Sequence, residues 1–218
     1  MTNTDAIAEQ LGSCYTAVVH DVLRDMGHKN FLLPAELRPL LPGKTMSGPA
    51  FTIEGHPDES VDNHDTLLAW TGILSEAPSG HVWVCQPNTH DTALMGELSA
   101  ETLQKKGLVG CVIDGKIRDS EFMVKSGFQN FHIGFTPRDI PGRWMPVATR
   151  AAIHIGEVRI EQGDFIVGDR DGVLRVPRDI AAEVAEKSVT AMHAENTVRS
   201  GIMDGMDPQE AYLKYNKF

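Results

Sequence analysis

The stretch from residue 81 to residue 135 limits the possible folds most, because short apolar runs alternate in it with helical stretches. The apolar runs, which we expect to form strands, are residues 81–86 (HVWVCQ), 109–113 and 130–135. Helices are expected between them, from residue 96 to about 106 and from residue 119 to about 125. Strand, helix, strand, helix, strand is the order found in a parallel sheet with crossover helices. In such sheets, ligands bind outside the carboxyl ends of the strands.

The flanking segments add helices and antiparallel strands, so the sequence predicts a mixed parallel and antiparallel α/β fold. Before the central stretch we expect helices at 3–11 and 15–26, an irregular crossing at 33–48 and a strand at 50–54. Residues 152–177 alternate with period two, and Gly163-Asp164 and Asp171-Gly172 are strong hairpin signals. After them, Asp179 is expected to cap a helix that runs to about residue 201, and a last helix spans 208–215.

Composition excludes several classes of protein. A chain of 218 residues favours a single domain, residues 1–218. The net charge of -10 repels phosphate backbones, and therefore nucleic acid is not an expected partner. No apolar run is long enough for a membrane span, and the N-terminal residues lack a signal-peptide pattern, so we expect a cytoplasmic protein. Cys14, Cys85 and Cys111 lack CxxC spacing, which argues against a zinc site or a disulfide framework.

Candidate chemistry lies at the two ends of residues 96–123. The first turn of the helix that begins at Gly96 offers unpaired amides and a partial positive charge, which together can hold a carboxylate. These amides belong to Gly96, Glu97, Leu98 and Ser99. The following strand ends in a turn that brings Arg118 and Asp119 to the same edge of the sheet. A guanidinium binds a carboxylate through two hydrogen bonds, and an aspartate is a hard oxygen ligand for Mg²⁺ or Mn²⁺.

Other readings of these and neighbouring residues remain open. An Arg-Asp pair at a helix start is commonly a cap with a solvated partner, so the functional hypothesis requires that the two ends meet. Residues 56–65 are rich in His, Asp and Glu, but without metal-ligand spacing they favour a solvated loop and a helix start over a metal cluster. Lys116 is the nearest candidate for a Schiff-base lysine, although its turn position is expected to be wet. Neither GxGxxG nor GxSxG occurs, which argues against a nucleotide-type cofactor and a serine hydrolase.

The sequence ALMGELSAETLQKKGLVGCVIDGKIRDSE resembles the signature of the RraA-like family. That family includes the class II 4-hydroxy-4-methyl-2-oxoglutarate / 4-carboxy-4-hydroxy-2-oxoadipate aldolases. The resemblance rests on Ala93-Leu94, Gly96, Glu97, Ala100, Gly107, Gly110, Asp114-Gly115 and Arg118-Asp119, and it extends to Gly163-Asp164, Asp169, Asp171-Gly172-Val173 and Val176-Pro177. It implies an α/β sandwich similar to the swivelling phosphohistidine domain, assembled as homotrimers or homohexamers with sites between subunits.

The resemblance also implies roles for individual residues. The backbone from Gly96 to Ser99 would bind the pyruvyl part of a 2-oxo acid substrate, and Arg118 would contact its carboxylate or keto oxygen. Asp119 would bind Mg²⁺ or Mn²⁺ directly or through water, and Glu97 would orient water near the metal. Glu195 of a neighbouring subunit would add a second metal-binding carboxylate. The implied reactions are cleavage to pyruvate and decarboxylation of oxaloacetate. Some members instead bind ribonuclease and helicase partners without catalysis, which is the alternative expectation.

Overall fold

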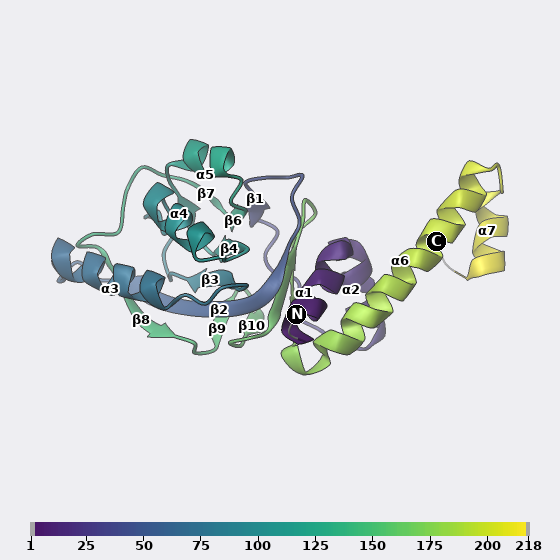
Figure 1. Cartoon of the computed structure of the whole chain (residues 1–218), viewed down its shortest axis with the longest axis horizontal. Helices are drawn as coiled ribbons and strands as arrows, with labels where there is room; N and C mark the ends of the chain where they lie inside the picture. Colours follow the sequence, from purple (N-terminus) through teal and green to yellow (C-terminus); the bar gives the residue numbers. More distant parts are fainter. Residues whose placement is uncertain (1–2, 217–218) are drawn as a thin grey trace.

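The structure, a computed structural model, describes residues 3–216, and two short helices open the chain (Figure 1). These are α1 (Asn3–Ser13) and α2 (Thr16–Asp25), close to the predicted bounds. Helix α2 buries Val18, Val19, Val22 and Leu23, the residues at helical spacing. Gly27 follows its C-terminus with φ of +83°, a left-handed conformation that glycine adopts without steric cost.

The central sheet is parallel at its core, as predicted. Strands β2 (Met46–Pro57), β3 (Val82–Gln86), β4 (Gly110–Ile113) and β6 (Asn130–His132) are hydrogen-bonded in that order, all parallel. Their crossover helices are α3 (Asn63–Glu76), α4 (Glu97–Lys105) and α5 (Ser120–Ser126). The short strand β1 (Arg38–Pro39) lies antiparallel to β6 at one edge.

Antiparallel strands surround this core, which confirms the predicted mixed fold. Strand β8 (Trp144–Thr149), which the sequence analysis missed, pairs with β2, and the short β5 (Lys116–Ile117) and β7 (Gly134–Phe135) pair with each other in parallel. The two hairpins are β9 (Ile153–Ile155) with β10 (Val158–Ile160), and β11 (Phe165–Gly168) with β12 (Val173–Val176). Strand β11 also joins the central sheet by pairing antiparallel with β2.

One of the two predicted hairpin turns is wrong. Asp171-Gly172 does connect the paired strands β11 and β12. Gly163-Asp164 instead links β10 to β11, which belong to different sheets, and the first hairpin turns at Gly156. The backbone of Asp164 is paired elsewhere, with β2. The Asp164 carbonyl oxygen accepts a hydrogen bond of 2.7 Å from the Ala50 amide.

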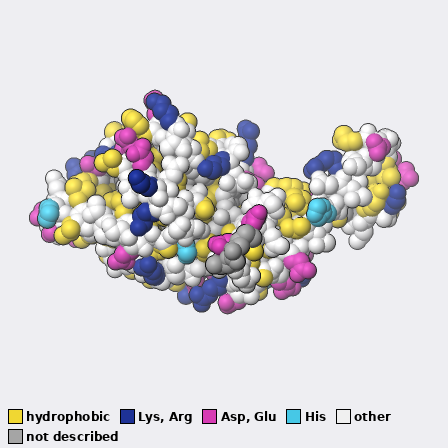
Figure 2. Space-filling view, viewed as in Figure 1, with side chains coloured by type: hydrophobic (Ala, Val, Ile, Leu, Met, Phe, Trp, Pro, Cys, Tyr) yellow, Lys and Arg dark blue, Asp and Glu magenta, His cyan; other side chains and the backbone are white. Residues whose placement is uncertain are grey.

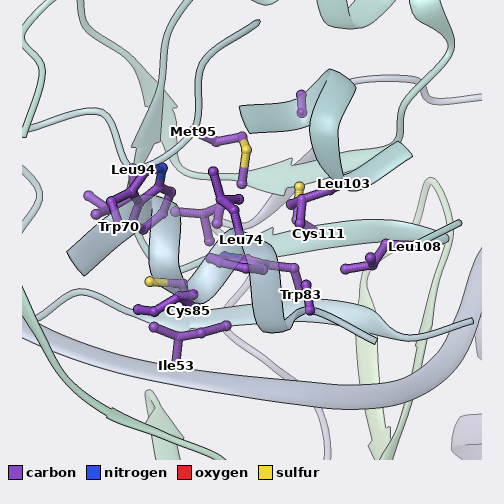
Figure 3. Packing of buried hydrophobic residues seen from close by; sticks show 14 of the residues in the cluster. Ile53, Trp70, Leu74, Trp83, Cys85, Leu94, Met95, Leu103, Leu108 and Cys111 are labelled. Carbon is purple, nitrogen blue, oxygen red and sulfur yellow. The ribbon is translucent and has the colours of Figure 1, made fainter. Parts of the chain in front are cut away.

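Both faces of the central sheet are covered, which explains the continuous apolar run in β3. Trp83 and Cys85 belong to the core between the sheet and helices α3 to α5, whereas Val82 and Val84 belong to the core on the opposite face, with the β9–β10 hairpin. Successive side chains of a strand point to opposite faces, so a strand covered on both sides is apolar throughout. Figure 3 shows Trp83 and Cys85 among the side chains of the first core.

The C-terminal part packs against the first two helices and then leaves the body. It comprises the 3-10 turn η1 (Arg178–Ile180), α6 (Ala181–Met203) and α7 (Pro208–Tyr215). The start of α6 forms a third core with α1 and α2, and the rest of α6 projects with α7 as an arm (Figures 1 and 2). The predicted cap at Asp179 is wrong, since its carboxylate lies 3.6 Å from Nε of Arg178 and caps no helix. Among the described helices, none has the length and hydropathy for a membrane span.

We expect Asp164→Ala to lower the free energy of unfolding by about 3–5 kcal/mol, the usual cost of leaving one partner of a buried ion pair alone. Asp164 is buried, and its Oδ2 accepts from Nε of Arg175 at 2.7 Å and from the Glu161 amide at 2.8 Å. Urea denaturation measures the change. Asp179→Ala is the control, because that side chain is 89% exposed and should alter stability little. Equal losses in both variants would contradict the prediction.

Candidate functional site

A short stretch of backbone pairing joins the two ends of residues 96–123. The Leu94 amide donates to the Lys116 carbonyl at 2.9 Å, and the Arg118 amide donates to the Met95 carbonyl at 2.9 Å. Ala93 and Lys116 form a parallel bridge in the same register. Because both hydrogen bonds come from the backbone, they fix the start of α4 against the residues before α5. The two ends of the segment therefore lie together.

Asp119 follows this pairing in a left-handed backbone conformation. Its φ of 54° and ψ of 33° are uncommon outside glycine, although aspartate tolerates them better than most residues. Its Oδ2 accepts a hydrogen bond of 3.3 Å from the Glu97 amide and lies 3.5 Å from Nε of Arg118. Unusual backbone conformations cluster at functional sites, where surrounding contacts hold them in place. Here they turn the Asp119 carboxylate toward the N-terminus of α4.

Gly96 allows this close approach through its missing side chain. A Cβ atom at this position would lie 2.8 Å from Oδ2 of Asp119 and 3.3 Å from Nε of Arg118. The backbone of Gly96 is extended, with φ of -134°, so its conformation alone does not require glycine. The requirement is space for the two functional side chains.

These residues line one pocket of about 370 Å³, between α3, α4 and the loop after β7. All six residues predicted for substrate binding and catalysis contribute to its lining: Gly96, Glu97, Leu98, Ser99, Arg118 and Asp119. Within the described part of the chain, the amides of Leu98 and Ser99 donate no hydrogen bond. Free amides at a helix N-terminus attract anions, so this end of the pocket suits a carboxylate.

The pocket also contains residues that the sequence analysis missed. Asp139, from the loop after β7, places Oδ2 3.5 Å from Nη1 of Arg118, so that the guanidinium is held between two carboxylates. No local pattern marks this aspartate. Leu67, Trp70 and Leu74 of α3 form the facing wall. Their spacing of three and four residues is the usual sign of an apolar helix face and was a detectable signal.

The residues present fit a hydrated Mg²⁺ or Mn²⁺ ion better than a closed metal cage. In residues 3–216, no three His, Cys, Asp or Glu side chains come together to share a metal. Mg²⁺ keeps several waters and is commonly bound through one or two carboxylates together with substrate oxygens. Asp119 is partly exposed, and its Oδ1 bonds to no described residue. Asp119 therefore offers one oxygen to such an ion, with Glu97 nearby.

Glu195 lies outside this pocket. It is on α6, which Figure 1 shows beyond α1 and α2 on the side away from α4. The Tyr15 hydroxyl donates a hydrogen bond to the Glu195 carboxylate. Burial, together with that carboxylate, raises the pKa of the Tyr15 phenol. A role for Glu195 in metal binding requires a neighbouring subunit and stays a prediction.

The acidic and histidine-rich residues 56–65 form an exposed loop and a helix start. Asp62 accepts a hydrogen bond of 2.8 Å from the Asp65 amide and caps α3. Asp58 accepts from the Ser60 amide at 2.9 Å. These hydrogen bonds are local and shape the entry to α3, which agrees with the solvated reading of this stretch.

Comparison with known proteins identifies the family. The family model described as Aldolase/RraA (RraA-like) matches residues 16–175, which contain the whole pocket. This chain therefore belongs to the RraA-like family.

Individual relatives are distant. Protein DlpA of Legionella pneumophila is 27% identical over 96% of this chain, but the match covers 34% of DlpA, so the chain spans about a third of that protein's length. A protein of Halalkalibacterium halodurans with the provisional name 4-hydroxy-4-methyl-2-oxoglutarate aldolase is 25% identical, covering 84% of this chain and 83% of its own. The crystal structure of RraAS2 from Streptomyces coelicolor, described as an unusual member of the RNase ES inhibitor RraA protein family, has a TM-score of 0.78 at 26% identity and covers 89% of this chain and 96% of its own.

We expect Gly96→Ala to lower the affinity of the pocket for its ligand without unfolding the protein. The new methyl group would press on the ends of two flexible side chains, Arg118 and Asp119, which can rotate toward solvent. If displacing these two side chains costs as much as overpacking elsewhere, roughly 1–3 kcal/mol, the affinity should fall by about five- to 150-fold. Calorimetric titration with pyruvate and Mg²⁺ measures the affinity, and thermal unfolding measures the fold. Gly43→Ala, at a position with nothing within 4 Å, is the control. Unchanged affinity in Gly96→Ala would contradict the prediction.

Proposed function

We propose that this protein is a divalent-metal-dependent class II pyruvate aldolase, which cleaves 4-hydroxy-2-oxo acids to pyruvate and a keto acid. The observation that carries the proposal is the convergence of Arg118, Asp119 and the free amides of Leu98 and Ser99 on one pocket. The name of the Halalkalibacterium halodurans relative supports the reaction class. The first substrates to test are 4-hydroxy-4-methyl-2-oxoglutarate and 4-carboxy-4-hydroxy-2-oxoadipate.

Substrate binding would use the polar end of the pocket. Asp119 and Asp139 both lie 3.5 Å from nitrogens of Arg118, and these contacts hold the guanidinium at the pocket wall. From that position Arg118 can bind the substrate carboxylate with two charge-assisted hydrogen bonds. The amides of Leu98 and Ser99 would contribute further donors at the positive end of α4.

In the proposed reaction, the C3–C4 bond breaks and its electron pair remains on C3 of the pyruvate enolate. A divalent ion at Asp119 would supply electron withdrawal from the 2-keto oxygen, where negative charge develops. A water held by Glu97 would take the proton from the C4 hydroxyl as the new carbonyl forms, and would later return a proton to C3. Loss of CO₂ from oxaloacetate leaves the same enolate, so we propose decarboxylation as a side activity.

A Schiff-base mechanism has less support. Lys116 belongs to β5, and its carbonyl takes part in the pairing with Leu94. Its side chain is not part of the pocket lining. A nucleophilic lysine needs a desolvated position next to the substrate carbonyl, which Lys116 does not have.

We further propose that the protein assembles as a homotrimer or homohexamer, in which Glu195 of one subunit completes the site of another. The arm formed by the end of α6 and by α7 exposes apolar side chains, with Met203 and Leu213 each 76% exposed (Figure 2). Large apolar side chains on a projecting element favour contact with another chain.

A non-catalytic role as a protein-binding regulator of ribonuclease activity is the second candidate. The similarity in fold to RraAS2 favours it. Against it stands the arrangement of Arg118 between two carboxylates beside free helix amides, because a surface that only binds proteins has no need of such a concave site. The absence of pyruvate release from any 4-hydroxy-2-oxo acid would favour the regulator.

We expect EDTA to abolish pyruvate release and Mg²⁺ or Mn²⁺ to restore it. Arg118→Lys and Asp119→Asn should each lower kcat/KM by about 100-fold or more, as expected when one charge-stabilising group is removed from an active site. A coupled assay for pyruvate measures both effects. Arg138→Ala, an exposed arginine close in sequence to Asp139 but outside the pocket lining, is the control and should keep its activity. Metal-independent turnover would disprove the class II mechanism.

A further inference from the structure

A hydrogen bond between helices α3 and α4 reaches the polar end of the pocket. The indole nitrogen of Trp70 on α3 donates to the Ser99 hydroxyl, in the first turn of α4, at 2.9 Å. Both residues line the pocket, together with Arg118 and Asp119. The Ser99 hydroxyl therefore belongs to the same helix turn as the free Ser99 amide, at the positive end of α4.

The direction of this hydrogen bond leaves the Ser99 hydroxyl with a hydrogen to donate. An indole N–H can only donate, so the serine oxygen must be the acceptor. A serine hydroxyl has one hydrogen and two lone pairs, and the contact with Trp70 uses one lone pair. Toward the residues 3–216, the Ser99 hydroxyl donates no hydrogen bond. A hydroxyl that accepts a hydrogen bond also becomes a stronger donor, because the two bonds polarise each other.

The position of Ser99 at the helix start explains why its hydrogen is not used within α4. Serine and threonine hydroxyls inside a helix can donate to the carbonyl four residues earlier. Thr102, almost one turn later, does so with the Leu98 carbonyl at 2.7 Å. For Ser99 the equivalent carbonyl belongs to Met95, which precedes the helix and accepts the Arg118 amide at 2.9 Å. The carbonyl that would take the Ser99 hydrogen in a longer helix is thus engaged in positioning Arg118.

Trp70 is held by the core and therefore fixes the Ser99 side chain as well. It is buried, and its ring meets those of Trp83 and Trp144 edge-on, with ring centroids 5.4 and 5.8 Å apart. Edge-to-face contacts of this kind favour one ring orientation. Figure 3 shows Trp70 and Trp83 within the same core cluster. Because the N–H direction follows the ring, the core determines which lone pair of Ser99 is used, and the hydroxyl hydrogen points away from Trp70.

Satisfying a buried indole does not by itself require a serine. The indole nitrogen of Trp144 donates to the Pro87 carbonyl at 2.9 Å. A carbonyl oxygen ends such a chain of hydrogen bonds, whereas a hydroxyl accepts one bond and donates the next. At Ser99 the chain can therefore continue to a ligand in the pocket.

We propose that the Ser99 hydroxyl donates a hydrogen bond to the carboxylate of the bound 2-oxo acid, and that Trp70 is a positioning residue for this hydroxyl. The inference rests on the proposed aldolase function, which supplies the carboxylate. The other donors at this end of the pocket are the amides of Leu98 and Ser99 and the guanidinium of Arg118. Ser99 thus binds the ligand through its side chain as well as its backbone. Since the carboxylate does not react, the contact acts on affinity rather than on bond cleavage.

Ser99→Ala tests the hydrogen bond by calorimetric titration of the full chain with pyruvate in the presence of Mg²⁺. We expect the affinity for pyruvate to fall by about tenfold or more, the usual cost of losing a hydrogen bond to a charged group. Ser75→Ala is the matched control, because the Ser75 hydroxyl donates to the Thr71 carbonyl at 2.9 Å and lies outside the pocket lining. Its affinity should stay at the wild-type value. Unchanged affinity in Ser99→Ala would overturn the inference.

Trp70→Phe tests the positioning role, since it keeps an aromatic ring and removes the N–H. We expect pyruvate to bind about threefold more weakly when Ser99 is present, and no further loss in the Ser99→Ala background, because Trp70 acts through Ser99. Losses of equal size in both backgrounds would show that Trp70 contributes only packing, and would overturn its positioning role. Thermal unfolding of each variant measures any loss of stability separately.

Turnover separates this inference from the proposed function. With 4-hydroxy-4-methyl-2-oxoglutarate, Ser99→Ala should raise KM for pyruvate release and change kcat little, as for a contact made equally in the bound substrate and the transition state. If the wild-type protein cleaves this substrate and Ser99→Ala keeps both its KM and its pyruvate affinity, the inference fails and the aldolase function stands. Neither pyruvate binding nor turnover in the wild-type protein would disprove both. A changed oligomeric state of Ser99→Ala in sedimentation would assign the hydroxyl to a subunit contact and overturn the inference.

Discussion

The candidate site depends on the backbone pairing between residues 93–95 and 116–118. Two hydrogen bonds of 2.9 Å set the N-terminus of α4 against Arg118, although the chain makes a helix, a buried strand and a turn between them. Side chains alone would not fix such a register, because those of Arg118 and Asp119 are partly exposed. The missing Cβ of Gly96 then allows the Asp119 carboxylate to approach the helix end. Backbone pairing and this one small residue together preorganise the polar end of the pocket.

Two carboxylates beside one arginine also preorganise the site. Asp119 and Asp139 restrain the guanidinium from two directions, each at 3.5 Å, before any ligand binds. The pairs are partly exposed, so they contribute little to stability, and their effect is on the position of Arg118. In the proposed function, a substrate carboxylate would meet donors already in place, and less conformational freedom would be lost on binding.

Sequence patterns gave the central architecture and the polar half of the site because both depend on local signals. The alternation of apolar runs and helices identified the parallel strands, and Gly96, Arg118 and Asp119 stand at element ends that a parallel sheet brings together. Asp139 was not predictable, because its role comes from a loop that folds back on a distant arginine. The Gly163-Asp164 turn was misread for a similar reason: its partner is the Ala50 amide, far away in the sequence.

Backbone hydrogen bonds position one half of the pocket, whereas side chains of α3 form the other half. Substitutions in α3 can therefore change the second half alone. The polar half, where we propose that the pyruvyl group binds, is fixed by the paired backbone of residues 93–95 and 116–118. The facing wall comes from α3, whose side chains at the pocket mouth are partly exposed, as the 46% exposure of Leu67 shows. Substitution of such a residue would alter the surface offered to the C4 substituent of the proposed substrate without disturbing the register at Arg118. In the proposed aldolase, the chemistry of C–C cleavage and the choice of the second product would therefore be separable.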